Sequence, residues 1–311
     1  MIVEEKLKLD KDLYLAPLAG ITDPSFRIIA GRLGAGLCYT EMISSSGIVY
    51  NDRKTLEMLR VDPREKNTSV QIFGHDPQIM EAAVKKLNEY ETFKSLDINM
   101  GCPAPKIVKN GDGSALMTDL KRAREVIKAC VSNSKIPVSV KFRLGMNDDS
   151  INYIDLAQIC QEEGVSFVCL HARTREMFYK GKADWSCIKK LVESVDIPVI
   201  ANGDVFTKKD IEEVKAYTNC DGVLIARGAL HNPFVFSENE NRSVEELVEL
   251  IKEHYSLKVE LIGERRAIPE MRKHVNWYLK GLKNSSKVKD EINHLNDLEE
   301  IFQVLDDFKN A

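Results

Sequence analysis

The stretch "TSVQIFGHDPQIMEAAVKKLNEYETFKSLDINMGC" (residues 68–102) contains the pattern on which the fold prediction depends. Two short apolar segments, 68–74 and 95–101, are typical of strands, and residues 76–90 between them are typical of a helix. Asp76 is placed to cap this helix and Pro77 to occupy its first turn. A strand, a helix and a second strand in this order predict a parallel pair joined by a right-handed crossover.

The same alternation extends from residue 13 to about residue 230. Strand candidates begin at residues 13, 36, 68, 95, 137, 166, 198 and 221, and further helix candidates cover 120–131 and 152–164. The strands are apolar with little alternation, as expected when both faces of a sheet are covered. A doubly wound open sheet would give a similar pattern, but eight strands favour the (β/α)₈ TIM barrel. No helix can be assigned within residues 44–67.

The pattern changes after residue 242, where no strand candidates remain. Ser243 and Glu246 form a capping box at the start of a helical segment, 243–263. The segments "PEMRKHVNWYLKGL" (269–282) and "DLEEIFQVLDDF" (297–308) continue as amphipathic helices. We therefore expect a barrel domain over residues 1–236, a linker at 237–242 and a small all-α helical domain over 243–311.

The composition is that of an ordinary globular protein, with 43% hydrophobic and 30% charged residues in a chain of 311. Seven cysteines without a CxxC pair argue against a disulfide framework or a zinc ribbon and favour a reducing compartment. The charged start "MIVEEKLKLDKD" lacks the apolar region of a signal peptide. Since there is also no apolar run long enough to span a membrane, we expect a cytoplasmic protein without membrane contact.

The C-terminal ends of the predicted strands carry the candidate site, since active sites of TIM barrels lie there. These ends carry Gln71, Asn99, Cys102, Lys141, Arg143, His171, Arg173, Asn202, Gly203, Asp204, Ala226, Arg227 and Gly228. The ring is polar and cationic, with one thiol. Its single carboxylate does not support a two-carboxylate glycoside hydrolase, and one His with one Asp is a poor ligand set, so no metal site is expected.

Two turns indicate a phosphate site. "ANGD" (201–204) follows the seventh strand and "ARGAL" (226–230) the eighth, where such barrels commonly bind phosphate on backbone amides and a short helix. Both could also be ordinary turns with helix caps, but their occurrence together favours phosphate. Neither "GRLGAG" (31–36) nor "GDGSAL" (111–116) is a GxGxxG motif after a strand, so a Rossmann nucleotide site is not indicated.

Cys102 lies just beyond a strand, between Gly101 and Pro103, in a loop that can be neither helix nor regular strand. Buried filler cysteines usually lie within strands or helices, so this thiol suggests chemistry. The alternatives are a structural loop cysteine at position 102, a solvent-facing Lys141 and a core histidine at position 171. The other six cysteines fit a structural role.

Seven segments resemble the tRNA-dihydrouridine synthase family over residues 13–282. They are "APLAGITD" (16–23), "DINMGCPAPKIVKNGDGSAL" (97–116), "VKFRLG" (140–145), "LHARTR" (170–175), "IANGDV" (200–205), "LIARGALHNPF" (224–234) and "MRKHVNWYLKG" (271–281). The resemblance implies an FMN-binding barrel followed by a helical RNA-binding domain. It also implies that NADPH supplies the electrons that reduce the C5–C6 bond of uridines in tRNA.

The resemblance also implies residue roles. The flavin would contact Pro17, Leu18, Ala19, Gln71 and Lys141, and its ribityl phosphate would contact His171, Asn202, Gly203, Asp204, Ala226 and Arg227. Asn99, Arg143 and Tyr179 would hold the target uracil. Reduced flavin would deliver a hydride to C6, and Cys102, in its thiol form, would protonate C5. The chain departs from the family's usual residues at Leu18, Ala226, His231 and Phe234, and none of these is a catalytic position.

The C-terminal helices carry a second signal. Residues 265–289 contain eight Lys or Arg and a single acid, Glu270, in a chain of net charge −4. A solvated helix face is the alternative, but the resemblance favours tRNA binding through Arg272, Lys273 and Lys280. Two rival functions stay open: an FMN-dependent reductase of free pyrimidines, of the dihydroorotate type, and a tRNA-binding protein without catalysis.

Overall fold

The computed structural model describes residue 7 and residues 9–310, and it contains a closed barrel of eight parallel strands in sequential order. The strands are β1 (Leu13–Leu15), β2 (Leu37–Ser44), β3 (Thr68–Phe73), β4 (Phe93–Met100), β5 (Val138–Arg143), β6 (Phe167–His171), β7 (Val199–Asn202) and β8 (Gly222–Ile225). Pairing of β1 with β8 closes the barrel. The predicted TIM barrel is confirmed, while residues 1–6, 8 and 311 of the predicted domains, with part of the charged N-terminal stretch, lie outside the described residues.

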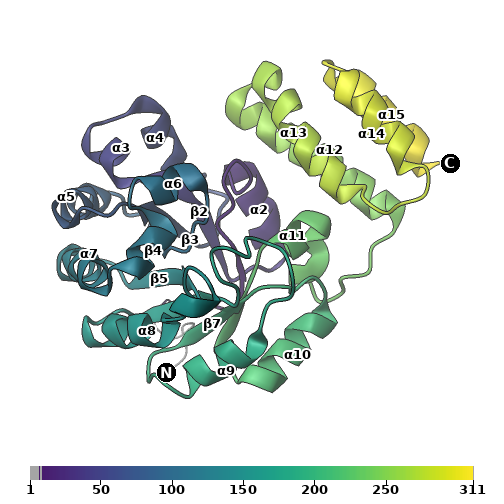
Figure 1. Cartoon of the computed structure of the whole chain (residues 1–311). Coiled ribbons are helices and arrows are strands. Elements are labelled where there is room, and N and C mark those ends of the chain that lie inside the picture. The colour runs from purple at the N-terminus through teal and green to yellow at the C-terminus, as the bar shows by residue number, and fades with distance from the viewer. Residues whose placement is uncertain (1–6, 8, 311) are drawn as a thin grey trace.

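Helices surround the barrel, as Figure 1 shows. They are α2 (Pro24–Leu33), α3 (Ser45–Val49), α4 (Arg53–Met58), α5 (Pro77–Leu87), α6 (Pro105–Lys109), α7 (Leu120–Asn133), α8 (Tyr153–Glu162), α9 (Trp185–Val192), α10 (Lys208–Thr218) and α11 (Arg227–His231). Asp76 caps α5 by accepting from the amides of residues 78 and 79, as predicted. The segment without a predicted helix contains the short α3 and α4, whose first turns are capped by Ser44 and Asp52.

Four helices follow the linker. They are α12 (Val244–Ile262), α13 (Glu264–Tyr278), α14 (Ser285–His294) and α15 (Leu298–Lys309). The capping box of Ser243 and Glu246 is present at the start of α12. Helix α13 begins five residues before the predicted Pro269, and α14 was not predicted, because residues 285–294 have only two fully apolar positions in a polar segment.

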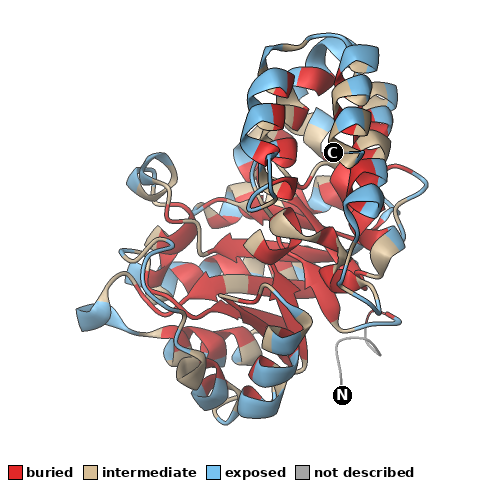
Figure 2. Ribbon diagram, turned by 90° about the vertical axis from the view of Figure 1, so that its right-hand side faces the viewer, coloured by how far each residue is buried: buried red, intermediate tan, exposed pale blue. Residues whose placement is uncertain are grey.

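The C-terminal helices pack against the barrel beside β1 and β8. Figures 1 and 2 show α12 and α13 next to α2 and α11, with buried residues on the sides that face the barrel. Phe26 of α2 stacks on His254 of α12, and His231 of α11 lies edge-on to Trp277 of α13. One apolar core runs through both parts, so the division into two domains stays a prediction.

A second apolar cluster fills the inside of the barrel. Tyr14, Tyr39, Phe167, Ile200 and Leu224 are all fully buried there. This interior is a packed core, so the chemistry must lie above it, at the strand ends. Among the residues that the structure describes, no helix has both the length and the apolarity that crossing a membrane requires.

Candidate active site

The barrel brings the predicted strand-end residues into one ring. Strand register pairs Asn99 with Lys141, Arg143 with His171, and His171 with Asn202. Because the strands are parallel and in sequential order, residues more than a hundred positions apart in the chain share one mouth. The structure thus collects the side chains that the sequence analysis assigned to one site.

The Cys102 loop is fixed from both sides of its backbone. Asn99 Oδ1 accepts hydrogen bonds from the amides of Gly101 (3.1 Å) and Cys102 (2.9 Å). Arg143 Nε donates to Gly101 O (2.8 Å), and Ser114 Oγ donates to Cys102 O (2.9 Å). The thiol is therefore held in a defined place at the end of β4, as a reacting group requires.

Cys102 is half-buried, and this burial raises the pKa of its thiol, although the amide of Ala104 and the charges of Arg143 and Lys141 oppose the shift. The thiol, rather than the thiolate, is thus the form present at neutral pH. A protonated sulfur at the end of a barrel strand can donate a proton. The thiol form is the one that a general acid requires, and the assignment of this role to Cys102 stays a prediction.

The turns after β7 and β8 form a cationic hollow. It is lined by His171, Tyr179, Asn202, Gly203, Asp204, Val205, Phe206, Leu224, Ala226, Arg227 and Gly228. Gly203 has φ +124°, a conformation that other residues rarely adopt, and a Cβ on Gly228 would lie 2.4 Å from the Val205 carbonyl oxygen. These two glycines therefore shape the hollow in a way that larger residues could not.

The charges around this hollow suit an anion. Asp204 accepts hydrogen bonds from Arg173 (2.6 Å) and Arg227 (3.1 Å), so one carboxylate serves two guanidinium groups. Burial, followed by the charges of Arg143, Lys141, Arg173 and Arg227, lowers the pKa of His171, which is neutral. Arg173 Nη1 is buried without a hydrogen-bond partner among the described residues. The residues thus fit a phosphate group, such as that of a flavin mononucleotide.

Tyr179 lies over the same hollow. Its ring is 5.7 Å from the Arg143 guanidinium and 5.2 Å from that of Arg227, and the residue is 52% exposed. Arg143 is only 2% exposed, and its Nη1 donates to the carbonyl oxygens of Thr174 and Phe178. Arg143 therefore ties together the two loops that flank the mouth, and its contact with uracil stays a prediction.

The end of β1 offers an uncovered apolar edge. Pro17 and Leu18 are half-buried and Ala19 is exposed, although Leu13–Ala16 before them are buried. The Gly20 amide that follows donates to the carboxylate of Glu41 on β2. An exposed apolar edge beside a cationic hollow is suited to a flat aromatic ring with an anionic tail.

The three predicted tRNA contacts, two on α13 and one just after it, have different environments. Arg272 is half-buried and donates to Leu295 O and Asn296 Oδ1, both at 3.1 Å. Lys273 lies against the end of β1, since a Cβ on Gly20 would be 3.4 Å from its Nζ. Lys280 is exposed and lies 5.0 Å from the Trp277 ring centroid. Of the three, Lys280 is the one free to meet a phosphate backbone without rearrangement.

The acid within the basic segment has a structural explanation. Glu270 pairs with the buried Lys258 (3.1 Å), which also pairs with Asp23, the N-cap of α2. Ser25 Oγ lies 3.1 Å from His254 Nε2 in the same interface. These contacts join α12 and α13 to the helix that follows β1.

Sequence reasoning assigned no role to Asp97 or Ser139, which lie one layer below the mouth. Asp97 accepts from Ser139 Oγ (2.5 Å) and from Gln71 Nε2 (2.7 Å). The sequence signal that could have pointed to Asp97 was a carboxylate within an apolar strand, two positions before Asn99.

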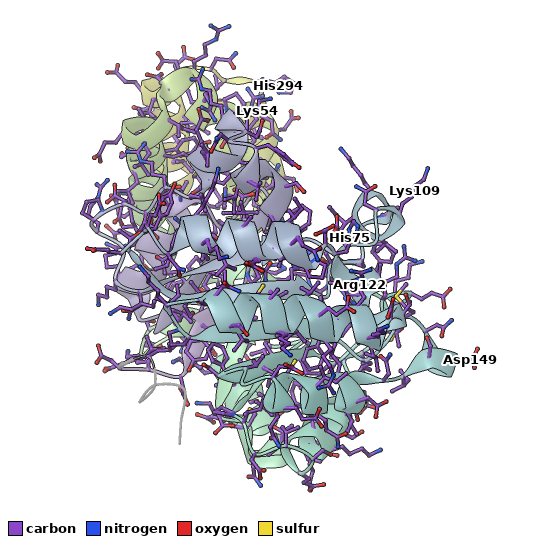
Figure 3. All side chains as sticks on the ribbon, turned by 90° about the vertical axis from the view of Figure 1, so that its left-hand side faces the viewer. Lys54, His75, Lys109, Arg122, Asp149 and His294 are labelled. Carbon is purple, nitrogen blue, oxygen red and sulfur yellow. The ribbon has the colours of Figure 1, made fainter. Side chains whose placement is uncertain are left out.

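A second side-chain pair, His75 and Asp112 (2.8 Å), links the loop after β3 to the Cys102 region at the rim. Figure 3 shows Lys109 projecting outwards in the same region.

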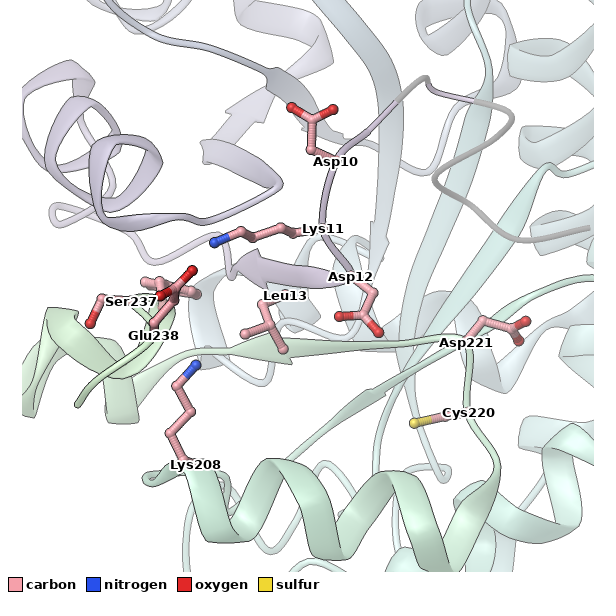
Figure 4. Close-up of a pocket in the computed structure, with 10 residues that line it drawn as sticks. Asp10, Lys11, Asp12, Leu13, Lys208, Cys220, Asp221, Ser237 and Glu238 are labelled. Atoms are coloured by element: carbon pink, nitrogen blue, oxygen red, sulfur yellow. The ribbon is translucent and has the colours of Figure 1, made fainter.

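Two larger cavities are present among the described residues. One, of about 770 Å³ (Figure 4), is lined by Asp12, Cys220 and Asp221 beside the N-terminal ends of β1 and β8, away from the mouth. The other, of about 1150 Å³, lies between α4, α12 and α13 and reaches the ends of β1 and β2 at Gly20 and Glu41. Within the described part of the chain, no cluster of three His, Cys, Asp or Glu could hold a metal ion.

Known structures share the fold. The chain superposes on the old yellow enzyme homologue of Zymomonas mobilis with a TM-score of 0.51 at 12% identity, covering 72% of this chain and 87% of that one. A 2-naphthoyl-CoA reductase gives a TM-score of 0.56 at 11% identity, covering 73% and 49%. At these identities the likeness shows a common barrel and nothing of the substrate.

Sequence comparisons reach further. A "Probable tRNA-dihydrouridine synthase" of Rickettsia bellii is 37% identical over 308 residues, covering 96% of this chain and 94% of that protein. The "tRNA-dihydrouridine synthase B" of Shewanella oneidensis is 36% identical over 282 residues, covering 88% and 87%. The family model described as "Dihydrouridine synthase (Dus)" matches residues 14–311. With the thiol loop and the cationic mouth in place, the chain belongs to the dihydrouridine synthase family.

Proposed function

We propose that this protein is a flavin-dependent oxidoreductase that reduces the C5–C6 double bond of uridines in tRNA to dihydrouridine. The bound flavin is FMN, the electron donor is NADPH, and the reaction takes place in the cytoplasm. One observation carries the proposal: a thiol, held on its loop by hydrogen bonds to the loop backbone, lies at the end of β4 in a barrel whose sequence matches the family model. The names and lengths of the relatives support tRNA as the substrate.

Residues of the chain would hold the cofactor at two ends. The phosphate and the ribityl chain would be bound by His171, Asn202, Gly203, Asp204, Ala226 and Arg227. The ring system would contact Pro17, Leu18, Ala19 and Gln71. Reduced FMN, when bound, supplies the hydride for C6 of the uracil. Lys141, half-buried and paired in register with Asn99, would provide positive charge next to the ring.

Cys102 completes the reduction. Hydride addition at C6 leaves an electron pair at C5, and the thiol proton of Cys102 moves to that carbon as the thiolate forms. Arg143 and Lys141 lie close enough to stabilise the thiolate, because both charges lower the pKa of Cys102. Asn99 and Tyr179 would orient the uracil, and a solvent proton restores the thiol.

The experiment is a reconstituted reaction. Purified protein with FMN and NADPH is incubated with tRNA from a strain that lacks dihydrouridine, and the modified nucleoside is measured by mass spectrometry. We expect dihydrouridine in tRNA and none from free uracil, uridine or orotate. Reduction of a free pyrimidine at a comparable kcat/KM would favour the small-molecule reductase, and a colourless protein that binds RNA would favour the non-catalytic alternative.

A further inference from the structure

Asp97 is a fully buried carboxylate directly beneath the proposed site. It lies on β4 two residues before Asn99, so the two side chains point to the same face of the strand, towards the barrel interior. Strand register places it between Gln71 of β3 and Ser139 of β5. A buried carboxylate is costly unless its hydrogen bonds do specific work, so its partners define its role.

A continuous chain of hydrogen bonds leads from Asp97 to the Cys102 loop. Gln71 Nε2 donates to Asp97 Oδ2 (2.7 Å), and Asn99 Nδ2 donates to Gln71 Oε1 (2.8 Å). Asn99 Oδ1 then accepts from the amides of Gly101 (3.1 Å) and Cys102 (2.9 Å). Two side-chain amides thus separate the carboxylate from the loop.

The chemistry of the two ends fixes the direction of this chain. A side-chain amide has a donor end and an acceptor end, whereas an ionised carboxylate only accepts and a backbone N–H only donates. The carboxylate of Asp97 therefore requires the NH₂ of Gln71. The oxygen of Gln71 then faces Asn99 and requires its NH₂, which leaves the oxygen of Asn99 for the loop.

The environment of Asp97 supports its role as an acceptor. Burial raises its pKa to about 6, while hydrogen bonds from Ser139 and Gln71 and the charge of Lys141 favour the ionised form. At neutral pH the carboxylate is thus mostly ionised.

We propose that Asp97 is a positioning residue of the reaction, which sets the direction of the Gln71 and Asn99 amides and thereby holds the thiol of Cys102 in place. The part that concerns catalysis rests on the proposed function; the part that concerns the loop does not. Without an acceptor at position 97, both amides can rotate, and the loop loses two hydrogen bonds. A displacement of the thiol by about 1 Å can slow proton transfer by up to about 10²-fold.

Two substitutions at position 97 separate the effect of the amide orientation from the effect of the carboxylate charge. Asp97→Val removes the acceptor. Asp97→Asn keeps a carbonyl oxygen that can face Gln71, with its NH₂ turned towards Ser139 Oγ, and removes only the charge. Ser139→Ala is the matched control, because it deletes an equally buried hydrogen bond to the same carboxylate but leaves the Gln71 side intact.

Hydrogen exchange of the holoenzyme, followed by mass spectrometry, reports on the loop without any tRNA. We expect the peptide containing Gly101 and Cys102 to exchange about tenfold faster in Asp97→Val, as the loss of a hydrogen bond implies. Asp97→Asn and Ser139→Ala should exchange like the parent, and other barrel peptides should be unchanged in all three. Loop protection in Asp97→Val, or its loss in Asp97→Asn, would overturn the proposal.

Single-turnover oxidation of the reduced flavin by tRNA tests the catalytic part. Asp97→Val should lower kcat by about 10–100-fold with little change in KM for tRNA, and Asp97→Asn should recover most of that loss. A kcat loss of equal size in both variants would show that charge, rather than direction, matters. Should Asp97→Val not fold, Asp97→Val with Ser139→Ala removes the orphaned hydroxyl, and Asp97→Asn tests the proposal by itself.

The two proposals can fail separately. If the parent enzyme forms no dihydrouridine in tRNA, the proposed function is wrong, and the exchange of the loop still decides the role of Asp97. If the parent is active and Asp97→Val is equally active with a protected loop, only the role of Asp97 is wrong.

Discussion

The barrel mouth and the C-terminal helices both carry many cations, but in opposite environments. Arg143 and Arg173 at the mouth are buried and bind backbone carbonyls or Asp204, and Lys141 beside them is half-buried. Most cations of residues 265–289, such as Arg265 and Lys283, are exposed. Buried charges act over a few ångströms and are hardly screened by salt, whereas exposed charges act through counterion release. The same residue types can therefore form a closed pocket in one region and an open cationic surface in the other.

The largest expected effect concerns the thiol at the mouth. Cys102→Ala should keep bound FMN and its reduction by NADPH, because the thiol lies on the loop rather than on the phosphate hollow. Oxidation of the reduced flavin by tRNA should slow by about 10²–10⁴-fold, the usual contribution of a general acid. Stopped-flow absorbance of the flavin measures both steps, and a parent-like oxidation rate would remove Cys102 from the mechanism. Cys187→Ala, at a half-buried cysteine on α9, is the control.

A buried-charge pocket should lose its cofactor when one charge is reversed. Arg227→Glu places a second carboxylate beside Asp204, and FMN affinity should fall about 10–100-fold, since a hydrogen bond to a charged group contributes about 1.5–3 kcal/mol. Fluorescence titration of the apoprotein with FMN measures the change. Lys209→Glu, at a lysine with an 81% exposed side chain, is the matched charge reversal and should bind like the parent. Full flavin occupancy of Arg227→Glu after dialysis would place the phosphate elsewhere.

The exposed cations should show their effect mainly through salt. Replacing Arg265, Lys283 and Lys287 by Glu should weaken tRNA binding and lower the log–log salt slope by roughly 0.7–0.9 for each phosphate that the variant no longer binds. Flavin content should not change. We leave Lys273 intact in this variant because it lies beside Gly20, at the end of β1.

A charge-matched control is available on the barrel. Replacing Lys121, Arg122 and Lys128 of α7 by Glu changes the net charge equally on a helix that Figures 1 and 3 show on the outer ring, away from α12 and α13. Its tRNA affinity should follow the parent at every salt concentration. Equal weakening by both triple variants would mean that net charge, and not the C-terminal surface, controls binding.

The smallest effect concerns pH and stability. Burial lowers the pKa of His171, His254 and His274, that of His254 to about 3. Below pH 6.5 these histidines bind protons in the unfolded chain but stay neutral in the folded protein. The free energy of unfolding therefore falls as pH falls, by about 1.4 kcal/mol per pH unit for each histidine. Asp97 has the opposite effect on stability between about pH 4 and 6. Because its pKa is raised, the folded state holds a proton that the unfolded chain has lost, so its contribution to stability grows as pH falls.

His274→Phe tests this account. Neither ring nitrogen of His274 has a hydrogen-bond partner among the described residues, and the ring packs beside Phe26 and His254. Urea unfolding should show little change at pH 7 and a gain of about 2 kcal/mol at pH 5. The exposed His294→Phe, labelled at the surface in Figure 3, should not show this gain. A pH dependence identical to that of the parent would contradict the assignment.

The sequence predicted the fold and the placement of the candidate residues at the strand ends, because both depend on local patterns, while the roles of those residues stay predictions. Strands, caps such as Asp76, and the loop of Cys102 follow from spacing and from Gly or Pro positions. The network beneath the mouth could not be predicted in this way, since Gln71, Asp97 and Ser139 come from three strands that only the closed barrel brings together.

The same reasoning explains what was missed in the C-terminal helices. A charge count treats Arg272, Lys273 and Lys280 alike, but tertiary packing half-buries the first two and leaves the third exposed. Glu270 looked like an exception to a basic face and is instead a partner of the buried Lys258. Which charge faces solvent is decided by packing, and packing is not visible in composition.

The contact of Lys258 with Asp23 spans 235 positions of the chain and has a consequence for biosynthesis. On a ribosome, α2 emerges early but has its partner helix only after nearly the whole protein has been made, and β1 likewise waits for β8. Contacts of such long sequence separation form slowly. The apolar edge at Pro17 and Leu18 follows β1 in this late-completed seam, so the mouth of the barrel is incomplete until β8 and α12 have both been made.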